Sequence, residues 1–182
     1  MSRIPPLLPH SLTPAQADLY ESIAGGARAQ GRQYFALTND DGSLTGPFNA
    51  LLLSPAVGSA VQELGAAVRY RTSLSPRERE LAILIVATHW DSAFERMAHE
   101  SIGRGVGLTE DELSAVREGR MPELDGRERA VALLTSALVL GDVDDALWAE
   151  ASGIIDQPTI FELTTLVGYY GLLALQLRVF RV

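Results

Sequence analysis

Apolar residues recur at three- and four-residue spacing along most of the chain. In one segment they fall at Leu81, Leu84 and Ile85. In a later segment they fall at Val131 and Leu134. This spacing places apolar side chains on one face of an α-helix, whereas a half-buried strand would alternate apolar and polar residues. Because convincing alternation bounded by turns is absent from the sequence, we predict an all-α fold.

Helix-start signals precede several of these segments. In a capping box, a Ser or Thr is followed three residues later by Glu or Gln, and the two side chains bind each other's backbone amides. Three such boxes and a weaker relative are Thr13-Pro14-Ala15-Gln16, Ser75-Pro76-Arg77-Glu78, Thr109-Glu110-Asp111-Glu112 and Asp125-Gly126-Arg127-Glu128. With the intervening turn residues, they predict helices over 14–29, 48–53, 55–71, 76–90, 92–105, 110–119, 126–140, 143–154 and 158–180.

The length of 182 residues predicts a single domain over 1–182, in which 1–54 form an N-terminal helical extension and loop. The segment Leu81 to Val86 is apolar on all sides, which is typical of a helix surrounded by protein. The predicted helices 76–90 and 92–105 are joined within a few residues, so we expect antiparallel or steeply crossed neighbours. Polar residues on both can therefore meet at their interface.

Composition and charge narrow the function. The chain contains no cysteine, which rules out disulfides, thiolate metal sites and redox chemistry by its own thiols, and fits a cytoplasmic location. The net charge of −8 argues against binding to phosphate backbones, so we expect no nucleic-acid partner. The N-terminus lacks the long apolar run of a secretory signal. Polar residues interrupt the most apolar stretch, 163–179, so we predict no membrane span.

The candidate catalytic residues are Glu80, Glu95 and His99. Glu95 and His99 are four residues apart and share one helical face. There a carboxylate can orient an imidazole, hold its tautomer and raise its pKa toward neutrality. Glu80 could close the arrangement from the neighbouring helix. Two carboxylates and one histidine in a partly apolar cleft would push their pKa values apart, as acid/base chemistry requires.

The same residues allow structural interpretations. By its spacing, Ser92 with Glu95 is itself a capping box, in which Glu95 would only bind backbone amides. His99 and Glu100 could be an ordinary half-exposed pair, and Glu80 could bond to a neighbouring arginine. On spacing alone, these interpretations outweigh the catalytic one.

A metal site of His89, Glu95 and His99 is a further alternative. The i,i+4 pair is Glu and His without a second histidine in register, which is weakly specific for a metal. We therefore predict neither a metal nor another cofactor.

Three consecutive motifs resemble a known family. The stretch 74–84 (LSPRERELAIL) resembles the opening of the carboxymuconolactone decarboxylase family, 94–99 (FERMAH) its aromatic-Glu-x-x-x-His signature, and 107–113 (GLTEDEL) the segment that follows. Together they form a core motif over about 74–119 without gaps. The resemblance implies a compact multi-helix bundle of the alkylhydroperoxidase-D-like (AhpD-like) type. It also implies a homo-oligomer, as a dimer, trimer or hexamer.

The resemblance extends to the AhpD-like enzymes of this family, which use a Glu, a Cys-x-x-Cys pair and a His in the same frame. Glu80 and His99 match the Glu and the His, whereas Ser92 and Glu95 stand at the two cysteine positions. Serine and glutamate cannot form a disulfide or reduce a peroxide, so we predict that the chain is not a peroxidase.

The decarboxylase branch of the family remains. It implies a cofactor-independent lyase acting on a small carboxylated lactone or keto acid of aromatic degradation. By resemblance, His99 is the proton donor or oxyanion partner, oriented by Glu95, with Glu80 as a second acid/base. The alternatives are a related isomerase or hydrolase, and a non-enzymatic helical binding or assembly module in which the three polar residues are structural.

The candidate substrate-binding residues are Arg96, Trp90, Asn49, Arg71 and Ser92. Arg96 stands where the family signature often has Trp and could bind a substrate carboxylate, as could Arg71. Trp90 could form a wall of the pocket, and the resemblance alone suggests that Asn49 reaches the site. The structural alternatives are a solvated helix residue for Arg96, a charged turn for Arg71 and core packing for Trp90.

Overall fold

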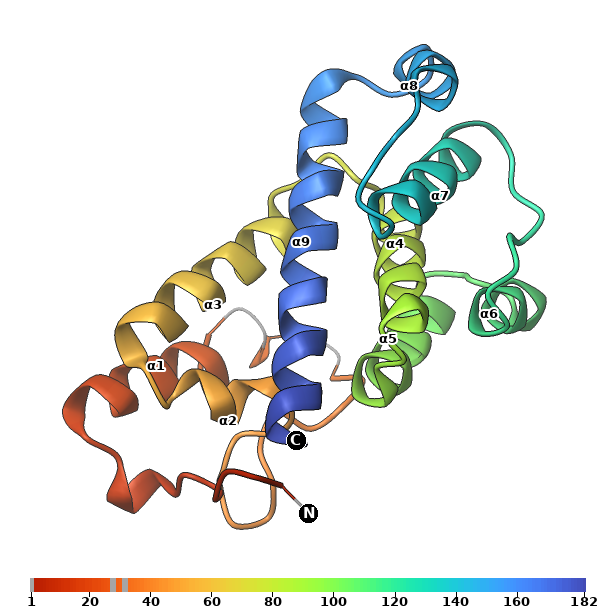
Figure 1. Ribbon diagram of the computed structural model, residues 1–182. Helices are drawn as coiled ribbons and strands as arrows, with labels where there is room; N and C mark the ends of the chain where they lie inside the picture. Colours follow the sequence, from red (N-terminus) through yellow and green to blue (C-terminus); the bar gives the residue numbers. More distant parts are fainter. Residues whose placement is uncertain (1, 27–28, 31–32) are drawn as a thin grey trace. The chain divides into compact units, whose positions relative to one another are not determined.

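The computed structural model describes residues 2–26, 29–30 and 33–182, and within them it contains nine α-helices and no β-strand (Figure 1). A short 3-10 turn, Pro9–Ser11, precedes the first helix. The helices are α1 (Pro14–Ala24), α2 (Pro47–Leu51), α3 (Pro55–Tyr70), α4 (Pro76–His89), α5 (Ala93–Gly105), α6 (Glu110–Arg117), α7 (Gly126–Leu138), α8 (Asp145–Ser152) and α9 (Gln157–Phe180). The predicted all-α class is confirmed.

The helix starts follow the capping signals. Thr13, Ser75 and Thr109 each accept a hydrogen bond from the backbone N–H three residues on, and the side chain there binds back to the cap. These three capping boxes satisfy amides that have no partner inside the helix. Asp125, the weaker signal, makes no side-chain capping hydrogen bond in the described structure.

The first helix is shorter than predicted. We expect it over 14–29, but α1 ends at Ala24, and Gly25 caps it through its N–H, which donates to the Glu21 carbonyl. Two consecutive glycines favour an end here because glycine loses the most backbone entropy in a helix. Residues 27–28 of the predicted helix lie outside the described residues, as do residues 31–32 of the loop that follows.

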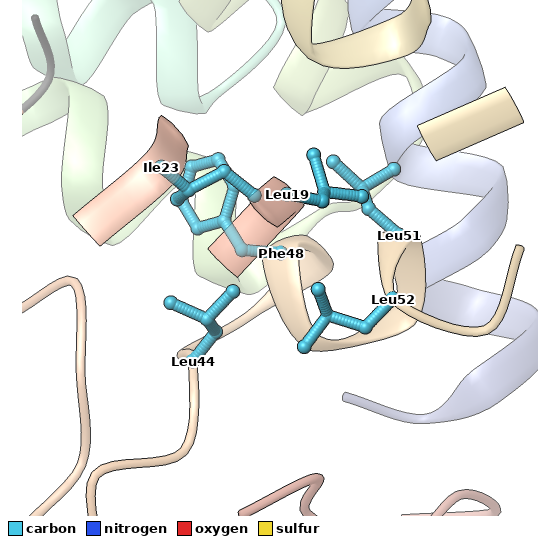
Figure 2. Close-up of a cluster of buried hydrophobic side chains, with 6 residues drawn as sticks. All are labelled: Leu19, Ile23, Leu44, Phe48, Leu51 and Leu52. Atoms are coloured by element: carbon cyan, nitrogen blue, oxygen red, sulfur yellow. The ribbon is translucent and has the colours of Figure 1, made fainter. Parts of the chain in front are cut away.

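The chain divides into two compact units. Unit 1 comprises the residues up to Tyr70 together with Leu175–Val182, and unit 2 comprises Arg71–Ala174. In unit 1, α1, α2 and the loop before α2 enclose an apolar cluster (Figure 2), which buries Leu19, Ile23, Leu44, Phe48, Leu51 and Leu52. Helix α3 packs on α1 and α2.

Unit 2 is built around α4, which packs against α5, α6 and α7 (Figure 1). In the predicted apolar segment 81–86, every residue is buried except Ile85, which is half-buried, and this confirms the prediction of a helix surrounded by protein. Leu81 and Leu84 pack with residues of α6 and α7 and with Leu108. Glu80 lies at the start of this apolar segment and is fully buried. The fold thus carries one carboxylate into the interior of unit 2.

Helix α9 is long and apolar enough to span a membrane by length and composition, but half of its most apolar window is buried within the protein. The core helix of a soluble protein meets the same criteria. The other half leaves large apolar side chains at the surface, among them Phe161, which is 72% exposed, and Leu175, which is 49% exposed.

Candidate functional site

The connection between α4 and α5 is three residues long and brings their polar side chains together. After α4 ends, Asp91 adopts a left-handed backbone conformation with φ of 51°, which aspartate tolerates better than most residues. The N–H of Ser92 then donates to the carbonyl of Ala87 at 2.8 Å, which closes the turn. Because α4 and α5 leave this turn as packed neighbours, their inward side chains share an interior, as the sequence predicts.

His99 on α5 meets Glu80 on α4. The Nδ1 atom of the ring lies 2.6 Å from a carboxylate oxygen of Glu80. Glu80 is fully buried and His99 is 7% exposed. With Glu80 ionised, the carboxylate accepts this hydrogen bond from Nδ1, and Nε2 is then the ring nitrogen without a proton in the neutral tautomer. A hydrogen bond of this kind fixes both the tautomer and the orientation of the ring.

This geometry corrects one predicted role. The sequence suggests that Glu95 orients His99 because the two share a helical face, but the structure gives that position to Glu80. The other oxygen of Glu80 lies 3.7 Å from the Nε of Arg79, so the alternative of an arginine partner is also partly realised. The alternative in which His99 and Glu100 form an ordinary half-exposed pair is wrong, because His99 is buried.

Tyr170 packs against the other side of this pair. Its ring meets the His99 ring edge-on with centroids 5.2 Å apart, and Tyr169 packs on Tyr170 in the same manner. Both tyrosines lie on α9 and are buried. Tyr170 is absent from the predicted site because it stands about 70 residues along the chain from His99, and the sequence suggests only a core or subunit-contact role for it. This edge-on packing of Tyr170 limits how far the His99 ring can rotate.

Glu95 is a buried carboxyl group on α5. It is 2% exposed, and neither of its oxygens has a hydrogen-bond partner among the described residues. Burial raises the pKa of Glu95 from 4.5 to about 7, and the nearby Ser92 hydroxyl, which does not reach hydrogen-bonding geometry, offsets this only in part. Glu95 is therefore half protonated near neutral pH, which suits a group that donates or accepts a proton.

The capping-box interpretation of Ser92 and Glu95 is wrong. Ser92 is the N-cap residue of α5, but its hydroxyl makes no capping hydrogen bond in the described structure. It is buried instead, like Glu95. The chain therefore keeps two polar side chains at the start of α5 inside the protein without a capping role. Buried polar atoms without partners are uncommon and often mark functional sites.

The other predicted residues of unit 2 lie near the α4–α5 turn or at the surface. Arg96 is half-buried and pairs with Asp91 at 2.8 Å. Trp90 is half-buried, meets His89 edge-on, and lies so near Gly171 that a Cβ there would stand 3.3 Å from the indole nitrogen. Trp90 thus packs α9 against the turn, as its core interpretation suggests. Arg71 is exposed at the start of unit 2.

Asn49 lies in unit 1 and has a structural task there. Its carbonyl oxygen accepts from the N–H of Leu7 at 2.9 Å, and its amide donates to the carbonyl of Pro5 at 3.0 Å. These two bonds hold the N-terminal segment and account for the burial of Asn49 without a substrate.

The metal alternative does not assemble. His89 is exposed at the end of α4, and no group of three His, Asp or Glu side chains in the described part of the chain is placed to hold a metal ion.

The sequence model of the carboxymuconolactone decarboxylase family matches residues 55–137. These residues belong to that family. The matched region includes Glu80, Ser92, Glu95 and His99, so the whole polar site, apart from Tyr170, lies within the family domain. The recognition of the family from its motifs is confirmed. None of the curated proteins matches the chain.

Two solved structures share the fold of the chain. A peroxidase-related protein from Ralstonia eutropha with an alkylhydroperoxidase AhpD core has a TM-score of 0.73 at 17% identity, covering 98% of this chain and 89% of its own. A protein of unknown function from Agrobacterium tumefaciens, described as an AhpD-type antioxidant defence protein, has a TM-score of 0.63 at 22% identity, covering 75% of this chain and 96% of its own. At these identities the likeness shows the fold, and the predicted AhpD-like bundle is confirmed.

Proposed function

We propose that the chain is a cofactor-independent enzyme of the carboxymuconolactone decarboxylase type. It would remove CO₂ from a small carboxylated lactone or keto acid by proton transfer at the Glu80–His99–Glu95 site. The observation that carries this proposal is the buried 2.6 Å hydrogen bond between Nδ1 of His99 and Glu80, with a second carboxyl group, Glu95, whose pKa burial raises to about 7. An ion pair with a purely structural role has no use for an additional buried carboxyl group. Acid/base chemistry uses such a group to donate or accept a proton.

The chemistry requires few groups. When the C–CO₂ bond breaks, its electron pair moves into a conjugated carbonyl of the substrate and forms an enolate. A proton then adds to carbon. The protonated Glu95 can donate to the enolate oxygen or to carbon, and Nε2 of His99 can carry the proton to or from it. Glu80 holds the ring throughout and stabilises the imidazolium when it forms. The buried setting strengthens each of these interactions.

Arg96 is the proposed carboxylate-binding group of this site. Its partner Asp91 is 82% exposed, and an exposed ion pair costs little to exchange for a substrate carboxylate. Arginine suits a planar carboxylate because its guanidinium presents paired donors. Thiol-dependent peroxide reduction needs the cysteine pair, and the chain has no cysteine.

The test is CO₂ release from 4-carboxymuconolactone and from a β-keto acid, with the product formed in D₂O analysed for carbon-bound deuterium. We expect His99→Gln to lose about 100-fold or more in turnover. The matched control is His10→Gln, which alters an exposed imidazole near the N-terminus and should leave turnover unchanged. Circular dichroism reports whether each variant is folded.

The pH profile of the wild-type enzyme keeps the proposal testable even if His99→Gln unfolds. If protonated Glu95 is the acid, activity falls as the pH rises through about 7, and this limb disappears in Glu95→Gln. Equal turnover in wild type and a folded His99→Gln variant would overturn the proposal. So would the absence of decarboxylation with both substrate types. If neither substrate type is decarboxylated and His99→Gln lowers only the melting temperature, the results would favour the non-enzymatic alternative.

We propose in addition that copies of the chain associate through α9, because its large apolar side chains Phe161 and Leu175 are exposed. Light scattering on the wild type should give an oligomer, and Phe161→Glu should dissociate it. Val57→Glu alters a side chain that is 62% exposed on α3 and should leave the oligomer intact. A monomeric wild type would contradict this proposal.

A further inference from the structure

Unit 2 contains a pocket that is separate from the Glu80–His99 site. It has a volume of about 380 Å³ and is formed by α4, the end of α6, the segment between α6 and α7, and the end of α7 with the residues that follow it. Small-molecule sites typically span roughly 300–1,000 Å³, so the pocket is large enough for a small ligand. Neither Glu80 nor His99 lines it. Its apolar lining is supplied by Ile85, Val116, Met121, Val139 and Leu140.

The polar lining of this pocket is cationic. Its titratable side chains are His89 and Arg120, and none of the described lining residues is a carboxylate. That is unusual for a chain with a net charge of −8. Arg120 also pairs with Glu118 at 2.7 Å, but both side chains of this pair are more than half exposed. Such a pair contributes little and can yield to a better placed anion.

We propose that this pocket binds a small molecule with an apolar body and one carboxylate. The apolar body lies against Ile85, Val139 and Leu140, and the carboxylate faces Arg120 and His89. Charge complementarity selects the carboxylate, because Arg120 places a positive charge at the pocket of an otherwise acidic protein. This binding site requires no chemistry at His99, so it stands whether or not the proposed decarboxylase activity does.

The experiment is isothermal titration calorimetry of the full chain with octanoate, octanol and octylammonium. The three probes share one apolar chain and differ in the charge of the head group. We expect octanoate to bind one to one and more tightly than octanol, and we expect octylammonium to bind weakest.

Two surface arginines provide a matched pair of variants. Arg120→Glu should weaken octanoate binding by about tenfold or more, which corresponds to the loss of one charged hydrogen bond. Arg129→Glu makes the same change of charge at an exposed α7 residue outside the pocket and should change binding by less than about twofold.

The outcomes separate the possibilities. Equal affinity for octanoate and octylammonium would show an apolar cavity without carboxylate recognition and would overturn the proposal. An equal loss in Arg129→Glu and Arg120→Glu would show attraction by overall charge only. The absence of octanoate binding to the wild type would also overturn it. In each of these cases, decarboxylation by His99 remains a separate question.

Discussion

Replacing Glu95 by glutamine should stabilise the protein at neutral and alkaline pH. The reason is the burial of a carboxyl group that is 2% exposed and lacks a hydrogen-bond partner among the described residues. Its pKa is about 7 in the folded protein, against an ordinary value of 4.5. Between these two pH values, the folded chain keeps the proton and the unfolded chain releases it.

The sign of the effect follows from this difference. Where the folded state binds more protons than the unfolded state, stability falls as the pH rises. Below pH 4.5 the carboxyl is protonated in both states and adds no such cost. Above pH 7 it is ionised in both states, and the full cost of burying the charge is present. Raising the pKa from 4.5 to about 7 corresponds to about 3 kcal/mol, because each pKa unit equals about 1.4 kcal/mol.

The assay is urea unfolding of the wild type and Glu95→Gln, followed by circular dichroism between pH 4.5 and pH 8.5. The free energy of unfolding of the variant relative to the wild type should rise across this range by about 3 kcal/mol. The glutamine amide carries a desolvation cost of its own, but that cost is independent of pH. The test is therefore how the difference in the free energy of unfolding between the two proteins changes with pH, and not the size of that difference at any one pH.

Comparing the two proteins at each pH cancels the contribution of every other carboxyl group. Glu123→Gln is the matched control, since Glu123 is exposed and lies in the same unit. Its stability should parallel the wild type at all pH values. A difference between Glu95→Gln and the wild type that does not change with pH would refute the reasoning. A Glu95→Gln variant that becomes less stable relative to the wild type as the pH rises would also refute it.

Three further substitutions test the packing, each by urea unfolding followed by circular dichroism. Glu80→Ala should destabilise the protein by about 3 kcal/mol, because the buried His99 ring loses its charged acceptor; an unchanged urea midpoint would contradict the 2.6 Å contact. Ser75→Ala should cost about 1 kcal/mol through loss of the α4 cap, and Ser75→Thr should restore most of it. Gly58→Ala should cost about 2 kcal/mol because a Cβ there would collide with the carbonyl of Leu51; a neutral effect would show that α2 and α3 are not in close contact.

The fold was largely predictable because capping residues near the start of several helices determine where those helices begin. Thr13, Ser75 and Thr109 satisfy backbone amides wherever the rest of the chain lies, so their helices could be placed from the sequence. The short link between α4 and α5 likewise determines which helices are neighbours. The proximity of Glu80 and His99 therefore followed from the sequence.

The division of roles within the site was not predictable in the same way. Spacing shows that Glu95 and His99 share a face of α5, but it does not show whether the ring turns along its own helix or toward α4. Packing decides this, since Tyr170 from α9 packs on the ring and Glu80 on α4 binds its Nδ1. The burial of Glu95, and with it the raised pKa, is likewise a property of the packed structure that residue spacing does not show.

Asn49 and the cationic pocket illustrate the same limit. The short helix of Asn49 could be placed from the sequence, but the N-terminal backbone that its amide binds could not. The pocket combines residues of α4 and α7 with Arg120 from a connecting segment, and no motif links them. Only the packed structure brings these groups together.

The central claim is that Glu80 holds His99 by Nδ1 so that Nε2 is the nitrogen that exchanges a proton. Nitrogen-15 NMR of the histidine side chains tests it most directly, with the His99 signals assigned by their loss in His99→Gln. When the ring is neutral, the spectrum should show a protonated Nδ1 and an unprotonated Nε2, and Glu80→Gln should weaken this preference. A neutral His99 protonated at Nε2 in the wild type would contradict the account.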